Sequence, residues 1–377
     1  MKIILAPDKF KGSLTGNEFC DVVTIGIKKT IPTAEIIRLP LADGGDGTIE
    51  VLANPLQGEL ISVQVNDPLF RKIEASYLWI ETKQTAFIEM AEASGMKLLQ
   101  AAEQNCRKTT TFGTGEIILK AIEKGAKTII LGIGGSATND CGIGMAKALG
   151  YNFLDKNNQE IIPIGENLSS IQQIDTSKVH PKLASIDFKI ACDVTNPLHG
   201  LQGAAHVYGA QKGASQNDIE LLDNGLIHIA KIFQKEFNID AQNIEGSGAA
   251  GGMGAGTTVF LNGQLTSGIQ LVKELVDFDY NIQGADWIIT GEGKLDAQTF
   301  SGKTIIGVLE SSKKQQIPVA VFCGKIDMSQ KEIHQLGIAY VAEISAVAKN
   351  LEDAMQNTSH HLEKITESFT NYILNTN

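Results

Sequence analysis

Short apolar segments that stop at proline, glycine or an acidic residue recur along this chain, and they constrain its fold more than any other feature. The first segment, residues 2–7, is apolar and ends in proline, the pattern of a buried parallel strand. A helix is predicted next, because Thr15 and Glu18 form a capping box and Pro32 ends the amphipathic segment that follows. Residues 35–41 form the next predicted strand. The N-terminus is therefore predicted to be β-α-β.

The C-terminal third repeats this alternation of strands and helices. Strands are predicted over residues 286–290, 317–323 and 338–344, with a helix from about 302 to 314. Ser329 and Glu332 form a second capping box. One last amphipathic helix is predicted from apolar residues that recur at spacings of three, four and seven, namely Leu351, Met355, Leu362, Ile365, Phe369 and Ile373.

The middle of the chain has a different pattern. Residues 60–65 and 73–80 flank Asn66-Asp67-Pro68, a turn signal typical of an antiparallel strand pair. A chain of 377 residues also exceeds one ordinary core. We therefore expect an α/β protein in which residues 1–60 and 275–377 form a doubly wound domain and residues 61–274 form an inserted second α/β domain.

Charge and composition exclude several classes of function. A net charge of −11 opposes binding to nucleic acid. No apolar run approaches the ~20 residues of a membrane span, and no leader pattern opens the chain, so a cytoplasmic location is expected. The cysteines occur in no C-x-x-C pair and are expected to be reduced and free of zinc: Cys20, Cys106, Cys141, Cys192 and Cys323.

Ligands of open parallel sheets bind beyond the carboxyl ends of the strands, and this rule selects candidate residues here. Five predicted strand ends, including those of residues 128–131 and 187–192, carry acidic residues, glycines or both. They are Asp8 with Lys9 and Lys11; Asp43, Gly44, Gly45, Asp46 and Gly47; Gly134, Gly135 and Ser136; Asp193; and Gly291, Glu292 and Gly293 with Asp296.

Glycine loops at such positions let backbone N–H groups approach phosphate oxygens. The densest run, residues 246–256, contains Gly251 and Gly252. A packed or flexible connection is the alternative interpretation of this run, and it loses weight because several such loops occur together. Residues 301–304 resemble the end of a P-loop, but Ala297 occupies the position of its first glycine, so the segment is not a P-loop.

A rival interpretation comes from residues 132–137, which match the G-x-G-x-x-G/A dinucleotide fingerprint, with Asp155 about 20 residues further on. This pattern would indicate an NAD-dependent dehydrogenase of a small hydroxy acid. Against this interpretation, Gly142 and Gly144 fall within the helix that should follow the fingerprint. Each glycine destabilises a helix by about 1 kcal/mol relative to alanine. A non-catalytic sensor of a phosphorylated metabolite is a third hypothesis, although it would not need acidic residues at so many strand ends.

Taken in order, the loops resemble the class I glycerate kinases nearly from end to end. No single segment decides this, but their joint order is specific. Lys9, Asp46 and Cys141 depart from the family pattern, in which serine, glutamate and glycine respectively are usual. The matching segments are residues 6–13, 41–48, 66–69, 88–95, 110–116, 132–140, 191–198, 211–214, 248–252 and 290–293.

This resemblance implies a Rossmann-like domain joined to a second α/β domain. It also implies ATP and Mg²⁺ as cofactors and D-glycerate as the acceptor, with 2-phosphoglycerate the usual product. We expect no nucleic-acid or membrane partner, and the sequence leaves a homo-oligomer open.

Residue roles follow from the chemistry of phosphoryl transfer, which needs metal-held phosphates, positive charge and an oriented acceptor hydroxyl. A turn-forming role is the alternative for Asp193, and His199, His206 and His228 are expected to be structural or solvated. The predicted catalytic residues are Asp193, Lys11 and Asp8; the predicted cofactor-binding residues are Gly134, Gly135, Ser136, Gly251, Gly252 and Glu292; the predicted substrate-binding residues are Asp43, Gly44 and Lys212; and the predicted metal ligands are Asp43 and Asp193.

Overall fold

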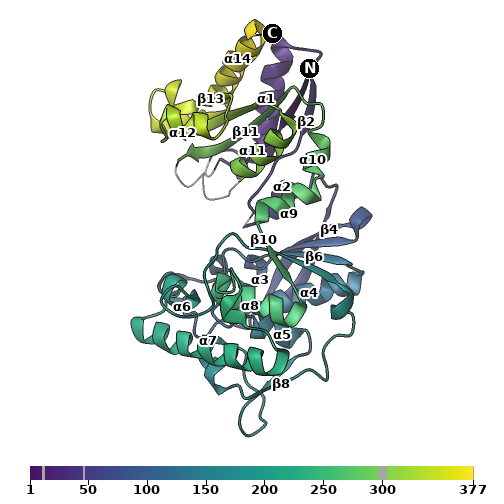
Figure 1. Cartoon of the computed structure of the whole chain (residues 1–377), viewed down its shortest axis with the longest axis vertical. Coiled ribbons are helices and arrows are strands. Elements are labelled where there is room, and N and C mark those ends of the chain that lie inside the picture. Colours follow the sequence, from purple (N-terminus) through teal and green to yellow (C-terminus); the bar gives the residue numbers. More distant parts are fainter. Residues whose placement is uncertain (11–12, 46, 297–303, 377) are drawn as a thin grey trace. The chain divides into compact units, whose positions relative to one another are not determined.

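The computed structural model of the chain describes residues 1–10, 13–45, 47–296 and 304–376 (Figure 1). These residues form two compact units. The first unit comprises Met1–Asp43, Glu50–Leu56 and Ile269–Asn377, and the second comprises Gly44–Ile49 and Gln57–Gly268. The expected domain limits at residues 60/61 and 274/275 stay a prediction, because compactness alone does not show that a segment folds as a domain.

The first unit contains a five-stranded parallel sheet made from both ends of the chain, as predicted for a doubly wound domain. Counted along the chain, its strand order is 2-1-3-4-5, and this order reverses between the first and third strands. The strands, in spatial order, are β2 (Glu35–Arg38), β1 (Lys2–Leu5), β11 (Trp287–Leu295), β12 (Val319–Ile326) and β13 (Tyr340–Glu343).

Two of these strands run further than the sequence predicts. Strand β11 continues to Leu295, so Glu292 lies within the strand and not in a loop after it. Strand β12 continues to Ile326, and the two strands stay paired to the end. The predicted strand end was placed too early, because glycines at 291 and 293 indicate a loop in sequence but extend a strand when the neighbouring strand supplies hydrogen bonds.

Helices α1 (Gly16–Thr30) and α14 (Thr358–Thr376) lie side by side against one face of this sheet (Figure 1). Thr15 and Glu18 form the predicted capping box of α1. The core on this face is aromatic, with Phe322 of β12 between Phe19 and Phe369 at ring-centroid distances of 6.3 and 5.6 Å. The other helices of the unit are α9 (Gly268–Leu275), α10 (Phe278–Asn281), α11 (Thr304–Gln315), α12 (Gln330–Gln335) and α13 (Leu351–Gln356), with α2 (Thr48–Leu52) spanning a unit boundary.

The single last helix predicted from residue 351 onward is wrong, because the chain forms two helices there. Helix α13 ends at Gln356, and the residue that follows it, Asn357, has φ −113° and ψ 28°. The Asn357 side chain donates a hydrogen bond to the Asp353 side chain at 2.7 Å, and asparagine is a poor helix former. The apolar spacing continues across the break, so periodicity alone conceals it.

The second unit contains a six-stranded mixed sheet. The predicted antiparallel pair is confirmed as its β3 and β4, and the remaining four strands run parallel. Parallel strands place their carboxyl ends at one edge, which is where candidate residues gather. The spatial order is β10 (Gln264–Thr266), β9 (Asp187–Ala191), β6 (Thr128–Gly132), β5 (Thr85–Glu89), β4 (Lys72–Ile80) and β3 (Glu59–Asn66).

Helices cover this sheet, and the longest, α7, is fixed by a capping box of Ser215 and Asp218. Among the described residues no helix is both long and apolar enough to cross a membrane. The other elements of the unit are α3 (Ala91–Ser94), α4 (Phe112–Lys124), α5 (Ile143–Ala148), β7 (Asn152–Leu154), β8 (Gln173–Asp175), α6 (Ala204–Tyr208), α7 (Gln216–Phe237) and α8 (Ala249–Leu261).

Candidate active site

Asp8 lies at the point in the first unit where the strand order reverses, between β1 and β11. Its backbone N–H donates to the carbonyl of Gly291 at 2.8 Å, which continues the pairing of the two strands. The hydroxyl of Thr304, the first residue of α11, donates to Asp8 Oδ2 at 2.6 Å, and the backbone N–H of Lys9 donates to Oδ1 at 2.7 Å. The carboxylate is therefore held in one orientation at the edge where doubly wound sheets bind ligands.

Two carboxylates lie close to each other at this edge. Burial raises the pKa of the Asp8 carboxyl, and the negative charge of Asp43 after β2 raises it further, while the hydrogen bonds from Thr304 and Lys9 lower it. Half-buried acidic groups that repel each other favour a bound cation. Among the described residues, no three acidic, histidine or cysteine side chains come close enough to hold a metal ion alone. Magnesium fits such a site, because it uses one or two carboxylates and takes its other ligands from water and phosphate.

The remaining predicted residues of this unit are placed as follows. Glu292 is half-buried on β11, and Lys9 is half-buried beside Asp8, where its charge lowers the pKa of that carboxyl. Lys11 lies outside the described residues, and so does Asp46.

Gly44 lies at the carboxyl edge of the sheet in the second unit, where only glycine fits. Its φ is +78°, and an added Cβ would come within 2.8 Å of the Gly268 Cα and 2.9 Å of the Ala191 Cβ. The carbonyl of Gly44 in turn lies 2.4 Å from the position of a Cβ on Gly132. The glycines of this loop therefore allow its backbone to pack against the ends of β6 and β9.

Glu89, the last residue of β5, fastens the same loop and was missed as a site residue in the sequence. Its side chain is 4% exposed, and its two carboxylate oxygens accept hydrogen bonds from Gly47 N–H at 3.1 Å and Ile49 N–H at 2.8 Å. The strand-end rule that selected Asp193 would also have selected Glu89, since an acidic residue there ends an apolar strand.

Gly134 and Gly135 form the open part of this edge. Both are exposed after β6. An added Cβ on Gly134 would meet only the Gly45 Cα, at 3.5 Å, whereas Gly135 has φ +69° and a Cβ there would lie 3.2 Å from the Ala91 Cβ. Their backbone is accessible to a ligand, in contrast to that of Gly44.

Lys212 lies behind this loop and is fully buried. Its ammonium group donates to Ser136 Oγ at 2.7 Å and to the carbonyl of Thr138 at 2.9 Å. Burial lowers the pKa of Lys212 to about 8, against the opposing effect of Cys106 and Asp140. The lysine thus fixes the Gly134–Ser136 loop from the inside and places a titratable charge beneath it.

Asp140 is a second buried charge that the sequence analysis did not select. Its carboxylate accepts hydrogen bonds from the backbone and hydroxyl of Thr111 and from the N–H groups of Gly142 and Gly144. Burial nevertheless raises the pKa of Asp140. Asp140 joins the start of α4 to the start of α5, which is a structural role.

Gly251 and Gly252 lie in a buried, tightly packed segment. Three consecutive residues, Ala250 to Gly252, have φ of 53°, 72° and 88°, and a Cβ on Gly251 would come within 2.0 Å of the Thr138 carbonyl. These glycines have a packing reason to be there, and their role in cofactor binding stays a prediction. Within the described residues, three buried polar atoms near this contact lack a hydrogen-bond partner: Thr138 Oγ1, Asn139 Nδ2 and Ser247 Oγ.

Asp193 follows β9 and is exposed. Its Oδ1 accepts a hydrogen bond at 2.9 Å from the N–H of Gly268, the first residue of α9. Asp193 therefore has an identified structural contact at the same edge as Gly44, which itself packs against Gly268. Its proposed metal partner, Asp43, belongs to the first unit.

The dinucleotide fingerprint has a different local structure from the one its pattern indicates. Helix α5 begins at Ile143, well beyond the fingerprint residues 132–137. Asp155 closes a turn after β7, where its carboxylate accepts from the N–H groups of Asn157 and Gln159. This geometry does not support an NAD site. Among the histidines, His228 contacts the carbonyl of Ile171 at 2.6 Å, which is a structural contact.

The chain is similar over its whole length to known proteins. Residues 3–374 match the model of the glycerate kinase family. A glycerate kinase of Bacillus cereus is 43% identical over 96% of this chain and 95% of its own length, and a glycerate 2-kinase of Escherichia coli is 42% identical over 94% and 93%.

A solved structure agrees with these matches. A crystal structure of a protein assigned as glycerate kinase 2 from Salmonella typhimurium LT2 superposes with a TM-score of 0.91 at 37% identity, covering 100% of this chain and 99% of that one. The α/β fold class is thereby confirmed. The chain belongs to the glycerate kinase family, whose members are phosphotransferases with an alcohol group as acceptor.

Proposed function

We propose that this protein transfers the γ-phosphoryl group of ATP to D-glycerate in the presence of Mg²⁺ and forms 2-phosphoglycerate. The observation that carries the proposal is the family match over residues 3–374. The 42% identity to a glycerate 2-kinase supports the choice of the 2-hydroxyl as acceptor. The carboxylates and open glycines at the two sheet edges supply the group types that this reaction needs.

Asp8 and Asp43 are proposed to hold Mg²⁺, whose charge neutralises the phosphate oxygens when the ion is bound. The open backbone at Gly134 and Gly135 is proposed to donate hydrogen bonds to phosphate oxygens. Asp193 is proposed to accept the proton of the glycerate hydroxyl, while that oxygen bonds to the γ-phosphorus and the bond from this phosphorus to the β,γ-bridging oxygen breaks. Lys212 is proposed to stabilise an anionic substrate through Ser136.

The reaction is tested with purified enzyme, Mg-ATP and D-glycerate. We expect ADP to form only when glycerate is present, and we expect ³¹P NMR to show the 2-phosphoester. A 3-phosphoester would contradict the regiochemistry and leave the kinase activity in place. NADH formation without any phosphoester would refute the proposed function.

The substitution Gly134→Ala tests the phosphate contact. Its Cβ meets only Gly45, at 3.5 Å, so the fold should be unaffected while the approach of a phosphate oxygen is obstructed. We expect the KM for ATP to rise by roughly tenfold, equivalent to about 1.4 kcal/mol, with an unchanged melting temperature. Gly134 is a better position than Gly135, because φ +69° at Gly135 would strain any substituted residue.

A control is Gly337→Ala, at a position with φ +78° where an added Cβ would meet nothing within 4 Å. It introduces backbone strain without touching the proposed loop, so its KM for ATP should equal that of the wild type. An unchanged KM in Gly134→Ala as well would show that phosphate does not contact this loop.

The substitution Asp193→Asn separates proton transfer from capping. Asparagine keeps the Oδ1 that accepts from Gly268 N–H, so α9 should stay capped, but it loses the charge needed to accept a proton. We expect kcat to fall by about 10²–10⁴-fold, the usual contribution of general acid–base catalysis, with little change in stability. Asp187→Asn, at the opposite end of β9, is the control and should retain full activity. A kcat for Asp193→Asn within a few-fold of the wild type would leave Asp193 with the capping role alone.

The pH dependence of substrate affinity tests Lys212. Because burial lowers its pKa from 10.5 to about 8, the folded protein loses this proton as the pH rises through 8, when an exposed lysine would still be charged. We expect the KM for glycerate to rise several-fold between roughly pH 7 and 9, since the positive charge behind Ser136 disappears. The variant Lys212→Met should have a high KM that does not vary over this range, and a KM of the wild type that is constant with pH would exclude the role.

A further inference from the structure

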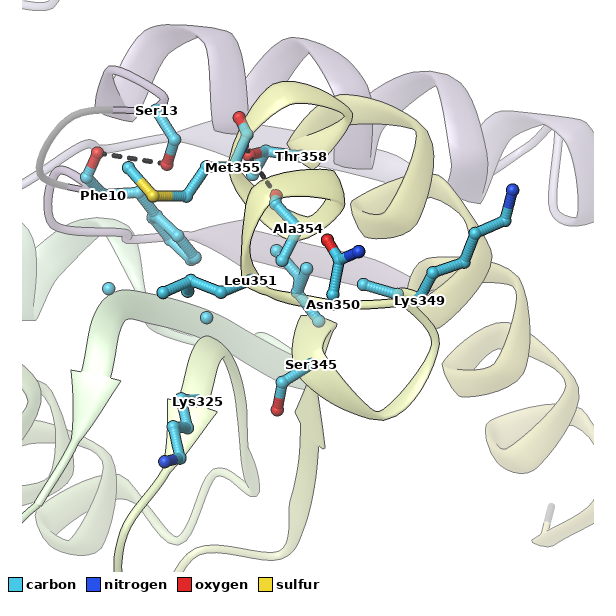
Figure 2. Close-up of a pocket in the computed structure, with 14 residues that line it drawn as sticks. Phe10, Ser13, Lys325, Ser345, Lys349, Asn350, Leu351, Ala354, Met355 and Thr358 are labelled. Carbon is cyan, nitrogen blue, oxygen red and sulfur yellow. Dashed lines mark hydrogen bonds between the residues drawn. The ribbon is translucent and has the colours of Figure 1, made fainter.

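A pocket of about 470 Å³ opens in the first unit, at the carboxyl ends of β11, β12 and β13 (Figure 2). Its floor includes Gly293 of β11 and Gly324 of β12, and its walls include Phe10 and residues of α13. The volume lies within the ~300–1,000 Å³ of typical small-molecule sites. None of the roles proposed above uses this pocket.

The hollow is produced by a pair of glycines that face each other across the ladder. The register pairs Glu292 with Cys323 and Lys294 with Lys325, which sets Gly293 opposite Gly324. Two residues earlier on the same face of β12, Phe322 fills the core, because residues i and i+2 of a strand lie on one face. Gly324 is also sterically required, since a Cβ there would come within 2.4 Å of the Gly293 carbonyl. The sheet therefore lacks side chains at Gly293 and Gly324, next to an aromatic core.

The walls of the pocket are mainly apolar, with a buried inner side and an exposed outer rim, and Lys325 and Lys349 also line it (Figure 2). Phe10 is 2% exposed and stacks on Phe19 at a ring-centroid distance of 5.5 Å. On the other side, Leu351 and Met355 project from α13 toward Phe10, although they are 76% and 49% exposed (Figure 2). Large apolar side chains left exposed around a concave site indicate a bound partner or ligand.

The position of the pocket connects it to the reaction site of this unit. Phe10 follows Asp8 by two residues, and Gly293 follows Glu292 directly. A ligand in the pocket would therefore lie beside the reversal point of the strand order, where Asp8 is held by Thr304. The apolar side chains of the walls offer phosphate oxygens no hydrogen-bond donor and would impose a large desolvation cost, so a charged part of the ligand would have to extend beyond them. Lys325 and Lys349 are the charged residues among those that line the pocket.

We propose that this pocket binds the nucleoside of ATP, with the base against Phe10, Leu351 and Met355 and the phosphates extending toward Asp8. This proposal rests on the proposed kinase function. A flat, uncharged base suits apolar walls, and polar groups at the rim such as Ser13, Ser345 and Asn350 suit a ribose. Glycerate does not suit the pocket, because it is small and carries a full negative charge.

The test compares ATP with inorganic tripolyphosphate, which has the phosphates but no nucleoside. Two substitutions alter the pocket without changing the charge of the protein. Leu351→Gln removes an apolar side chain from the wall, and Ala348→Trp fills the cavity that Ala348 lines. Dissociation constants are measured by calorimetry with Mg²⁺ present. We expect the Kd for ATP to rise several-fold in Leu351→Gln and at least roughly tenfold in Ala348→Trp. The Kd for tripolyphosphate should not change in either variant.

Leu374→Gln is the matched control, since Leu374 is 50% exposed on the same unit. It lies in α14, 16 residues beyond the pocket residue Thr358, roughly 24 Å along the helix. This variant should bind both ligands like the wild type.

The outcomes separate this proposal from the proposed function. If the wild type forms ADP with glycerate but Ala348→Trp binds ATP normally, the nucleoside lies elsewhere and this inference fails alone. Equal weakening of ATP and tripolyphosphate would also overturn it, because the variants would then act on the phosphate site or the fold. A wild type that binds neither ATP nor adenosine would refute the proposed function and this inference together.

Discussion

The first unit depends on the parallel pairing of β1 with β11. This pairing joins residues near the N-terminus to a strand that begins at Trp287, and it makes the strand order of the sheet reverse at that point. Because β1 ends before β11 does, the chain after β1 leaves the sheet beside the continuing strand, and Asp8 is fixed there by Gly291 and Thr304. The acidic edge follows from this contact, whereas the pocket next to it depends on the pairing of β11 with β12 that sets Gly293 opposite Gly324.

In the second unit, most glycines serve close backbone packing, and few of them leave backbone open to a ligand. Gly44 and Gly251 each lie against the backbone of another segment at distances that exclude a Cβ. Gly134 and Gly135 are the exposed exceptions among the glycines predicted to bind ligands. Close backbone packing and close approach to a phosphate both require glycine, so a dense glycine run does not distinguish between them. An exposed glycine pair after a strand is stronger evidence for a phosphate site.

Buried charges fix the loops of this edge in place. Lys212 holds the 134–138 segment, and the Glu89 carboxylate holds the loop at Gly47 and Ile49. Both charged groups make hydrogen bonds, which a charged group buried away from water requires. Gly134, in the segment that Lys212 holds, is by contrast exposed, and so is Asp193. The left-handed φ of 54° at Cys141 also gives a reason for the glycine that is usual in the family at this position.

The sequence by itself determined the features that depend on neighbouring residues. The strands at both chain ends, the capping boxes at Thr15 and Ser329 and the antiparallel pair around Asn66 were all predictable, because periodicity and capping involve residues only a few positions apart. The order of the loop segments along the chain likewise identified the family. Tertiary structure alone decided that Glu292 lies within a strand, that Asp193 is exposed and that Lys212 is buried. It also created the hollow over Gly293 and Gly324. Burial and hydrogen-bond partners depend on segments that are distant in sequence, and no local pattern records which of those segments will meet.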